Sequence, residues 1–550
     1  MTLTAPNNST LSYTYDGSLA LSETWGNGPI TGTLTRSYNN DFRVTTLGVK
    51  GNSVNYQYDD DGLLTQVGHF LLHREVQNGF LTGTTLGNVI TQQTLNPFGE
   101  LESRTATYQG NTLYQVAYQR DKLGRLIQKV ETIESETTTY NYHYNLVGQL
   151  VEVFQNGISL NRYGYDDNGN RIKLNGVVVG SYDVQDRLVQ YEENQYTYTE
   201  NGELKTTTNT VTHETTSYTY DVFTNLTRVQ LPDGTEIEYL IDGRDRRIGK
   251  QVNGQLVQGF LYQGSLNPVA ELDVNGNLVT RFVYGGRSNV PAYLIKNEQT
   301  FRVIADSLGS PRLVVNIATG EIVQRMDYNE FGKVIEDTNP GFQPFGFAGG
   351  LYDSDTGLVR FGARDYDPEV GRWTAKDPID FDGGDANLYG YIWNDPINFA
   401  DPSGLCAGVC TGPIVIGIIR GGQAAYRAYR AWKLAQAMQN EIGDDDAETE
   451  DDDTTESAAE QCPDLTGKTR DEARKELEKL GFKDNGTSPG GYEKWYHPDG
   501  SRVYIKPDNS ISRTGPKIKN PDPNKRGYRP RIGPDGKPTS SHNTGETVVD

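Results

Sequence analysis

Hydrophobic and polar positions alternate over short stretches along the first 350 residues, and these stretches recur at loosely regular intervals. Each unit joins an aromatic strand, a turn with Asp or Asn and Gly, and a second apolar strand, as in YTYDGSLAL, YQYDDDGLLTQV, YHYNLVGQLVEV and YGYDDNGNRIKL. The run Tyr140, Tyr142, Tyr144 places three rings on one strand face, and Asp167 to Gly169 supplies positive-φ turn residues. The pattern predicts a β-hairpin array over residues 1–350, whose units stack because one hairpin cannot bury its aromatic face.

The pattern changes after Leu405, which we interpret as a boundary. Residues 406–442 include an Ala-rich, helix-compatible stretch, whose stripe favours packing against the array over a membrane-surface role. Residues 443–464 are acidic and of low complexity, so we expect a disordered linker. In residues 465–550, the capping box from Thr469 to Glu472 predicts a helix that ends at Gly481, and Tyr492 to Ile505 predicts a hairpin followed by a strand at ISRT. We therefore predict a small α+β C-terminal domain.

Composition supports two parts with different partners. Gly (61) and Tyr (34) are abundant whereas Met (3) is scarce, which is typical of many short strands and turns. The net charge is −22, yet residues 465–550 hold 17 Lys and Arg against 12 Asp and Glu, so the tail is basic. The three Cys are too few for a disulfide framework. The N-terminus has no signal-peptide pattern, and the run GPIVIGII is far short of the roughly 20 residues of a membrane helix.

The repeated Y-x-Y-D-x-x-G-x-L units resemble YD repeats over about residues 10–405. Residues 351–405 contain GLVRFGARDYDPEVGRW, DPIDFDGGDANLYGYIWNDPINF and DPSGL, and this stretch resembles the core-associated segment of Rhs proteins. Rhs proteins are relatives of the C components of insecticidal Tc toxins and, more distantly, of teneurins. The resemblance implies a mainly β fold, in which a YD-repeat β-sheet spiral forms a shell around a variable C-terminal toxin. About 400 residues is fewer than the family uses for a closed shell, so we expect a partial spiral or another chain that completes it.

The resemblance also implies an activity. In the family the core segment, here residues 351–405, cuts the chain just after DPxGL, which would be between Leu405 and Cys406. It assigns the reaction to Asp377 of DPID and Asp401 of DPSGL. It further implies a cognate immunity protein, export by secretion machinery or on a spike or carrier protein without a cleavable signal peptide, and action in the cytoplasm of a target cell.

Chemistry gives independent grounds for this pair of carboxylates. Amide hydrolysis needs a carboxylate that activates water and an acid that protonates the leaving nitrogen, and two adjacent carboxyls can share one proton. Asp377 and Asp401 meet only if the intervening chain folds back, and we expect Arg372 and Lys376 to hold the first carboxylate ionised. Asp380 stands where the family usually has Gly and would add a third carboxylate. In the alternative interpretation, both Asp-Pro pairs simply begin turns.

For the C-terminal domain we predict metal-independent cleavage of RNA, which needs a base, an acid and cations for the phosphorane charge but no cofactor. The candidate acid or base residues are His542, His497 and Glu493. The candidates for phosphate or RNA binding are Lys525, Arg526, Arg529, Arg531, Tyr528 and Tyr504. In the alternative interpretation, His497 belongs to a hairpin turn and KRGYRPR is a solvated basic strand.

Other functional classes stay open to different degrees. A metal-dependent DNase is second, because neither an HNH motif nor a paired Asp/Glu-x-Lys cluster is clearly visible, and an ADP-ribosyltransferase is a further alternative. A deaminase would need a Pro-Cys-x-x-Cys motif, which this chain lacks. A non-enzymatic surface adhesion or sugar-binding array is the remaining alternative, against which the boundary and the basic tail argue.

Overall fold

The computed structural model describes residues 2–5, 9–405, 465–466, 468–487, 492–498, 501–514, 531–532 and 538–539. The chain divides into two compact units, Met1–Gly443 and Asp444–Asp550. Segments 406–442 and 443–464, for which we predicted a helix and a linker, lie outside the described residues.

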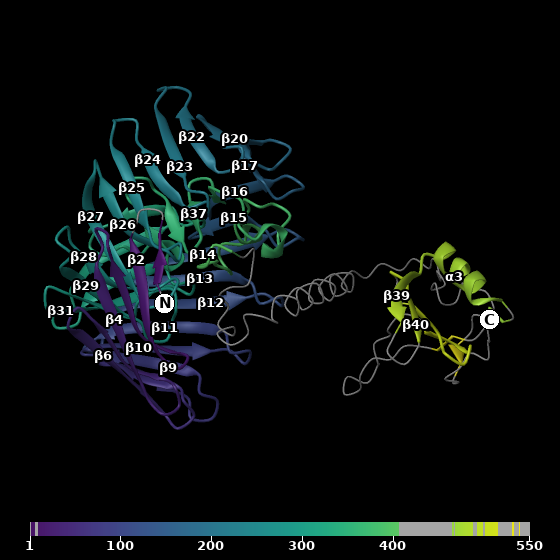
Figure 1. Cartoon of the computed structure of the whole chain (residues 1–550), viewed down its shortest axis with the longest axis horizontal. Helices are drawn as coiled ribbons and strands as arrows, with labels where there is room; N and C mark the ends of the chain where they lie inside the picture. Colours follow the sequence, from purple (N-terminus) through teal and green to yellow (C-terminus); the bar gives the residue numbers. More distant parts are fainter. Residues whose placement is uncertain are drawn as a thin grey trace. The chain divides into compact units, whose positions relative to one another are not determined.

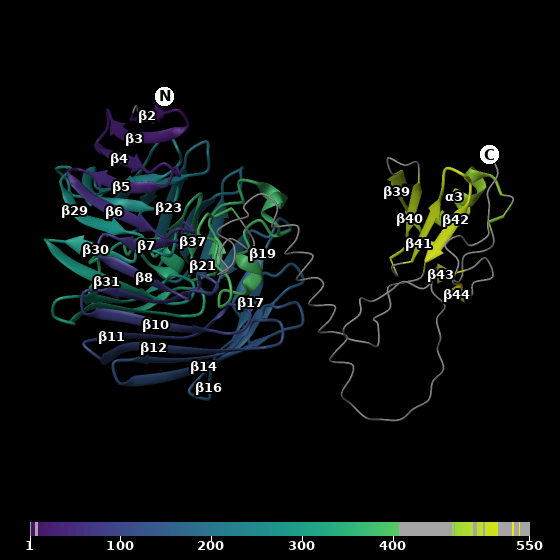
Figure 2. The same cartoon turned by 90° about the horizontal axis from the view of Figure 1, so that it is seen from below.

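The first unit begins with an 18-stranded antiparallel sheet in which each strand pairs with the next along the chain (Figures 1 and 2). Its strands are β1 (Thr2–Thr4), β2 (Thr10–Asp16), β3 (Leu19–Gly26), β4 (Gly32–Tyr38), β5 (Val44–Val49), β6 (Asn52–Tyr58), β7 (Leu64–Val67), β8 (Phe70–Arg74), β9 (Leu81–Leu86), β10 (Val89–Leu95), β11 (Leu101–Tyr108), β12 (Asn111–Arg120), β13 (Leu126–Ile133), β14 (Glu136–Tyr144), β15 (Leu150–Gln155), β16 (Ile158–Tyr165), β17 (Arg171–Leu174) and β18 (Val177–Val178).

A 16-stranded sheet with the same sequential antiparallel pairing follows. Its strands are β19 (Gly180–Tyr182), β20 (Leu188–Tyr191), β21 (Asn194–Tyr198), β22 (Leu204–Asn209), β23 (Thr215–Tyr220), β24 (Leu226–Gln230), β25 (Glu236–Ile241), β26 (Arg247–Val252), β27 (Gln255–Tyr262), β28 (Pro268–Leu272), β29 (Leu278–Val283), β30 (Tyr293–Lys296), β31 (Gln299–Ala305), β32 (Pro311–Asn316), β33 (Ile322–Tyr328) and β34 (Val334–Asp337). The predicted mainly β, shell-like array of hairpins is thereby confirmed.

The recurring shape of the hairpin turns has a local cause. Asp121 Oδ1 accepts hydrogen bonds from the backbone N–H groups of Leu123 (2.9 Å) and Arg125 (3.0 Å). Asp166 binds the N–H groups two and four residues later in the same way, at 3.0 and 2.8 Å. Asp and Asn favour such turns because their side chains imitate a backbone acceptor. The YD repeat therefore encodes both the strand and the turn that ends it.

Apolar side chains fill the space where the two sheets face each other. In one core, Leu34 and Leu47 of the first sheet pack with Phe260 and Val269 of the second. In another, Tyr114 of the first sheet packs with Leu313, among other residues of the second. Figure 2 shows β5 to β8 beside β29 to β31. Burial of these rows is the main stabilising contribution, at roughly 25 cal/mol per Å² of apolar surface.

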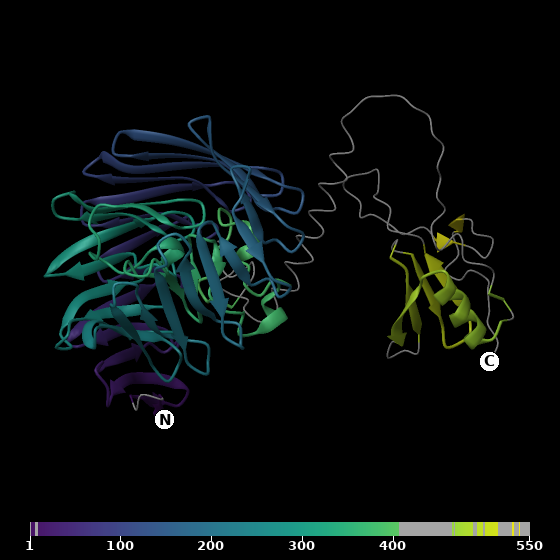
Figure 3. The same ribbon diagram turned by 90° about the horizontal axis from the view of Figure 1, so that it is seen from above.

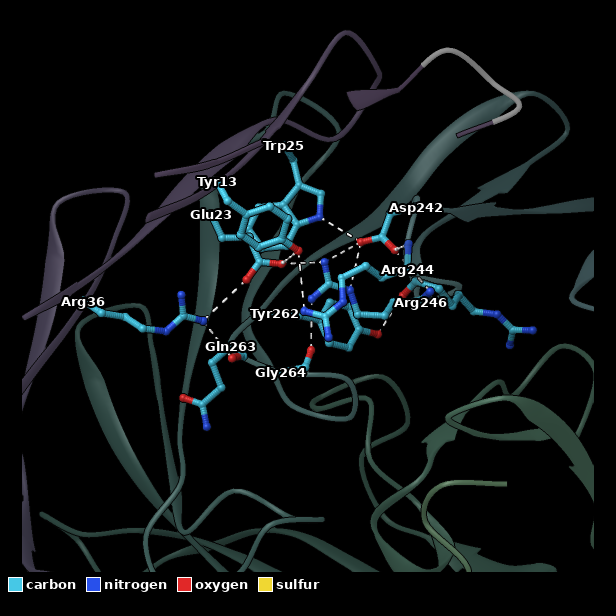
Figure 4. A network of polar contacts seen from close by, with 11 residues as sticks. Tyr13, Glu23, Trp25, Arg36, Asp242, Arg244, Arg246, Tyr262, Gln263 and Gly264 are labelled. Carbon is cyan, nitrogen blue, oxygen red and sulfur yellow. Dashed lines mark hydrogen bonds and ion pairs between the residues drawn. The ribbon is translucent and has the colours of Figure 1, made fainter. Parts of the chain in front are cut away.

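A buried ion cluster joins β3 to the turn between β25 and β26 (Figure 4). Arg246 Nη2 lies 2.7 Å from Glu23 Oε1 and 2.6 Å from Asp242 Oδ2, and all three side chains are at most 2% exposed. Trp25 Nε1 donates to Asp242 Oδ2 at 3.1 Å, and Arg36 Nη2 lies 3.4 Å from Glu23 Oε2. We call Glu23, Asp242 and Arg246 the Arg246 cluster.

Residues 351–405, the core segment, form a four-stranded sheet and short helical turns. In Figure 3 this green segment lies between the blue and teal strands of the two large sheets. We call the succession of hairpins in these two sheets the ladder. A buried aromatic cluster that includes Phe361, Tyr366, Trp373 and Tyr391 holds it together. Its elements, with the preceding turn η1, are η1 (Phe347–Gly349), β35 (Leu351–Tyr352), β36 (Val359–Phe361), β37 (Arg364–Asp367), β38 (Arg372–Trp373), η2 (Asp380–Gly383) and η3 (Ile392–Asn394).

Side chains of the core segment bind to successive hairpins of the ladder. Arg372 donates to Asn170 Oδ1 at 2.7 Å and to the carbonyl of Asp186 at 2.5 Å, so it bridges the two sheets near the break between β18 and β19. Further hydrogen bonds join Asn398 to Leu126 (2.7 Å), Asn394 to Gly169 (2.7 Å), Tyr389 to Gly202 (2.7 Å) and Arg360 to Asn225 (2.7 Å).

The second unit contains α3 (Arg470–Lys479) and a six-stranded antiparallel sheet. The predicted capping box is present between Thr469 and Glu472, and Gly481 has a φ of 85°. Ala473 and Leu477 of α3 pack with Trp495, Val503 and Ile505 of the sheet, among other residues. The predicted hairpin and third strand are confirmed as β40 to β42, whereas β39, β43 and β44 were not predicted. The strands are β39 (Lys483–Thr487), β40 (Glu493–Tyr496), β41 (Arg502–Ile505), β42 (Ile511–Thr514), β43 (Arg531–Ile532) and β44 (Pro538–Thr539).

Candidate active site

Asp377 and Asp401 meet at one arginine, Arg364 at the start of β37. The Arg364 side chain is 2% exposed. Its Nη2 lies 2.8 Å from Asp377 Oδ2 and 3.7 Å from Asp401 Oδ2, while the guanidinium stacks over the ring of Trp373 at 4.1 Å. The intervening chain therefore folds back as we predicted. We call Arg364, Asp377 and Asp401 the Arg364 site.

The second carboxylate is held by the turn that contains the DPSGL motif. Asp401 is fully buried, and its Oδ1 accepts hydrogen bonds from Ser403 Oγ (2.6 Å), Ser403 N–H (3.1 Å) and Gly404 N–H (3.0 Å). The N–H of Leu405 donates to Ser403 Oγ at 3.3 Å. Hydrogen bonds from neutral donors favour the ionised carboxylate. The turn thus couples Asp401 to the residue before the predicted cleavage point.

Arg364 also binds the backbone close to that point. Its Nε donates to the carbonyl of Gly404 at 2.6 Å. Gly404 has a φ of 66°, and a Cβ there would collide with the carbonyl oxygen of Phe361. Only glycine allows this turn to approach β36 without strain. The arginine therefore touches both carboxylates and the peptide chain that leads to Leu405.

A small pocket of about 10 Å³ adjoins the first carboxylate, and its lining includes Arg364, Asp377, Asp380 and Asp385. Such a volume is about what one water molecule occupies. Burial raises the pKa of Asp377, the Arg364 guanidinium opposes this, and Asp380 adds to the rise. Burial lowers the pKa of Arg364 to about 10, against the pull of Asp377 and Asp401. Asp380 lies near Asp377 as expected and adopts a φ of 49°, a conformation that glycine favours.

Our prediction that Arg372 and Lys376 hold the first carboxylate was wrong. Arg372 binds Asn170 and Asp186, and its guanidinium stacks over Tyr182 at 4.8 Å. The side chain of Lys376 lies beside Gly202. Arg364, which binds Asp377 instead, was missed because its partners are distant in sequence. The signal was an arginine within the aromatic run RFGARDY, where burial demands an acidic partner.

Three candidate residues of the second unit have described side chains, namely Glu493, His497 and Tyr504. Glu493 accepts from Arg470 Nη1 (2.8 Å) and from Arg474 Nε (3.0 Å), and Arg474 and Arg470 lower the pKa of Glu493 against the opposing effect of burial. The ring of His497 stacks on Phe482 at 5.2 Å. Tyr504 Oη lies 3.4 Å from Tyr496 Oη. The ion pairs of Glu493 tie α3 to β40.

The structure does not describe the side chains of the remaining candidate residues. Cys406, Lys525, Arg526, Tyr528, Arg529 and His542 fall outside the described residues, and for Arg531 only the backbone pairings with Thr514 and Thr539 are described. Within the described ranges no group of His, Cys, Asp and Glu is arranged to hold a metal ion. In the same ranges no helix is long and apolar enough to span a membrane.

Comparisons with known proteins agree on the first unit. A family model described as Teneurin YD-shell matches residues 2–397. Teneurin-3 of Danio rerio is 29% identical over 393 residues, which cover 66% of this chain and 14% of that protein. A protein of Burkholderia cenocepacia named Double-stranded DNA deaminase toxin A is 27% identical over 399 residues, covering 63% and 26%.

Two solved structures share the fold. The crystal structure of TcdB2-TccC3 has a TM-score of 0.54 and 17% identity, covering 72% of this chain and 24% of that chain. The Photorhabdus luminescens Tc holotoxin pore has a TM-score of 0.51 and 16% identity, covering 74% and 22%. The chain spans about a quarter or less of the length of each of these relatives.

Proposed function

Because the chain belongs to the Teneurin YD-shell family, we propose that it is an Rhs-type toxin that cuts itself after Leu405 and releases a C-terminal ribonuclease. The observation that carries self-cleavage is the convergence of Asp377, Asp401 and the Gly404 carbonyl on Arg364. The toxin would be exported and act in the cytoplasm of a competing bacterium, and its producer would need an immunity protein.

The proposed cleavage is an aspartate-assisted hydrolysis. Asp377, beside the water-sized pocket, takes a proton from water while the water oxygen attacks the carbonyl carbon of Leu405. The proton that Asp377 took passes to the nitrogen of Cys406 as the carbon–nitrogen bond breaks, and the second water proton moves from the new carboxyl group to the amine. The products are a Leu405 carboxylate and a Cys406 ammonium group, and Asp377 is again ionised. Arg364 keeps the two acids together and offers positive charge to the developing oxyanion.

Self-cleavage is tested by expressing the wild type beside Asp401→Asn. We expect two fragments from the wild type and one full-length band from the variant. Asp382→Asn serves as a matched control, because Asp382 is exposed on the same segment and does not line the pocket. A single band from the wild type, or two bands from Asp401→Asn, would refute the proposal.

The ribonuclease proposal rests on the second unit having its own core and a basic chain that re-enters the sheet at β43. His542 is the preferred acid or base, since it follows β44 by three positions whereas His497 packs on Phe482. The self-cleaved full chain should degrade total RNA in the presence of a chelator, and His542→Ala should abolish this. Loss of activity with chelator would favour a metal-dependent DNase, for which the name of the Burkholderia relative gives a second reason to test DNA.

Partners are also proposed from the relatives. The names of the Tc structures describe assemblies, TcdB2 with TccC3 and a Tc holotoxin pore. We therefore propose a carrier or another shell chain as a partner for the first unit. An ADP-ribosyltransferase activity is the outcome to examine if neither RNA nor DNA is cut.

A further inference from the structure

One face of the C-terminal sheet carries a row of residues in register across all six strands. The pairings are Lys483 with Tyr496, Tyr496 with Arg502, Arg502 with Thr514, Thr514 with Arg531 and Arg531 with Thr539. Directly paired residues lie on the same face of an antiparallel sheet. Over β39 to β41 the row therefore alternates a cation, an aromatic ring and a second cation, in the order Lys483, Tyr496 and Arg502.

A second row on the same face has the same character. It contains Lys494, Tyr504 and Ser512, two positions along each strand from the first row. None of the positions paired in the two rows is acidic. Neighbouring strands are about 4.8 Å apart, so Lys483 and Arg502 on alternate strands lie about 10 Å apart across the sheet.

The opposite face is occupied by the core. Trp495 and Val503 lie between the residues of the two rows along their strands, Ile505 directly follows Tyr504, and all three pack with α3. Glu493 pairs with Ile505 and binds Arg470 and Arg474, so this carboxylate belongs to the helix side. The helix-side face thus holds the apolar core with Glu493 and the buried Arg513, whereas the other face presents partly exposed cations and tyrosines.

The described side chains of the basic face are arranged for contact. Lys494, Tyr496, Arg502 and Tyr504 are each partly exposed, and none forms an ion pair within the described residues. The Arg502 guanidinium lies over the Tyr496 ring at 4.8 Å, and the rings of Tyr496 and Tyr504 are 6.2 Å apart with an interplanar angle of 79°. Stacking fixes the arginine while leaving its N–H groups able to bind phosphate.

We propose that this basic face, comprising Lys483, Lys494, Tyr496, Arg502 and Tyr504, binds single-stranded RNA. Cations would bind the phosphates and the tyrosines would stack with bases, a combination that recognises single strands. The choice of RNA rests on the proposed ribonuclease function, whereas the face itself follows from register and charge. The basic face is a substrate-binding surface that does not include the histidines considered for catalysis.

The test measures binding separately from cleavage. Full-length protein is titrated into a fluorescent RNA 12-mer with 2′-O-methyl groups, which cannot be cut through the 2′-oxygen, and anisotropy is followed at several salt concentrations. We expect Lys483→Gln combined with Arg502→Gln to weaken binding at least tenfold and to reduce the salt slope by about 0.7 for each phosphate that the protein no longer neutralises. Arg502→Lys should restore part of the affinity.

The matched control is Lys475→Gln, since Lys475 is exposed on α3 and its replacement removes the same type of charge. Equal weakening by Lys475→Gln would overturn the proposed face, as would wild-type protein that does not bind. Tighter binding to DNA of the same sequence would overturn the choice of RNA. Binding without degradation of unmodified RNA would keep the face and refute the ribonuclease, so the two failures are distinguishable. Unchanged circular dichroism of the variants ensures that weaker binding does not reflect unfolding.

Discussion

The Arg246 cluster and the Arg364 site have the same composition, one buried arginine with two carboxylates, yet they differ in geometry. Arg246 touches both acids closely, at 2.7 and 2.6 Å. Although burial lowers its pKa, Asp242 and Glu23 raise the pKa of Arg246 above the ordinary arginine value. Arg364 touches one acid at 2.8 Å and the other only at 3.7 Å, and its pKa falls to about 10.

The difference indicates what each group contributes. In the Arg246 cluster the two carboxylates are compensated by Arg246 together with Arg36, which lies 3.4 Å from Glu23, and the cluster joins Glu23 to Arg246 across 223 positions. In the Arg364 site the compensation is incomplete, Asp377 has a raised pKa, and a water-sized pocket adjoins the carboxylate. Incomplete compensation beside water is typical of catalytic groups, whereas complete compensation is typical of structural ion pairs.

The sharpest test exchanges lysine for each arginine. We expect Arg364→Lys to slow self-cleavage about 100-fold or more, because lysine cannot contact both acids and the Gly404 carbonyl at once. Arg246→Lys should leave the cleavage rate of folded protein within about twofold. The rates are measured by following fragment appearance on gels after synthesis in a cell-free system. Similar slowing by both variants would contradict a catalytic role specific to Arg364.

The stability of the first unit, unlike the cleavage rate, should depend on the Arg246 cluster. Glu23→Gln leaves Arg246 with one acid fewer, and we expect the free energy of unfolding of the first unit to fall by about 3 kcal/mol. Glu238→Gln is the control, because its ion pair with Arg228 at 2.8 Å is largely solvated and should contribute under about 1 kcal/mol. Denaturant titration measures both. A smaller decrease for Glu23→Gln than for the control would contradict the structural role of the Arg246 cluster.

The pH dependence of cleavage reports on Asp377. Asp377 acts as a base only when ionised, and its pKa is raised, so the cleavage rate should fall with acid at a higher pH than for a solvated aspartate near 3.8. Asp380 contributes to that rise. Asp380→Gly should therefore move the acid limb to lower pH. A limb that stays in place would show that Asp380 does not tune the base.

The smallest expected effect is at Ser403. Ser403→Ala removes the 2.6 Å hydrogen bond to Asp401 but retains the backbone N–H donors. A hydrogen bond of this kind contributes about 1 kcal/mol, which corresponds to roughly a fivefold slower cleavage. Ser403→Thr should keep most of the rate. Full activity of Ser403→Ala would contradict a contribution of the Ser403 hydroxyl to cleavage through Asp401.

The sequence allowed the hairpin ladder and the C-terminal helix to be predicted because their causes are local. The turn carboxylate of Asp166 and the capping box at Thr469 act within four residues. Asp377 and Asp401 were found through a resemblance, and their meeting could be expected. Arg364 could not, because its place depends on the packing of β37 against the aromatic cluster rather than on any spacing. The basic face was hidden for a similar reason, since it needs the register of six strands.

The hydrogen bonds of the core segment have a consequence for biosynthesis. Asn398 binds Leu126 across 272 positions, and Asn394 binds Gly169 across 225. Contacts of such long sequence separation form late in folding, and a chain made from its N-terminus cannot form them until Asn394 and Asn398 have left the ribosome. Asp401 is therefore seated only on a nearly finished ladder. The proposed cut would then serve as a checkpoint on translation, by which a truncated shell never acquires the geometry to free its cargo.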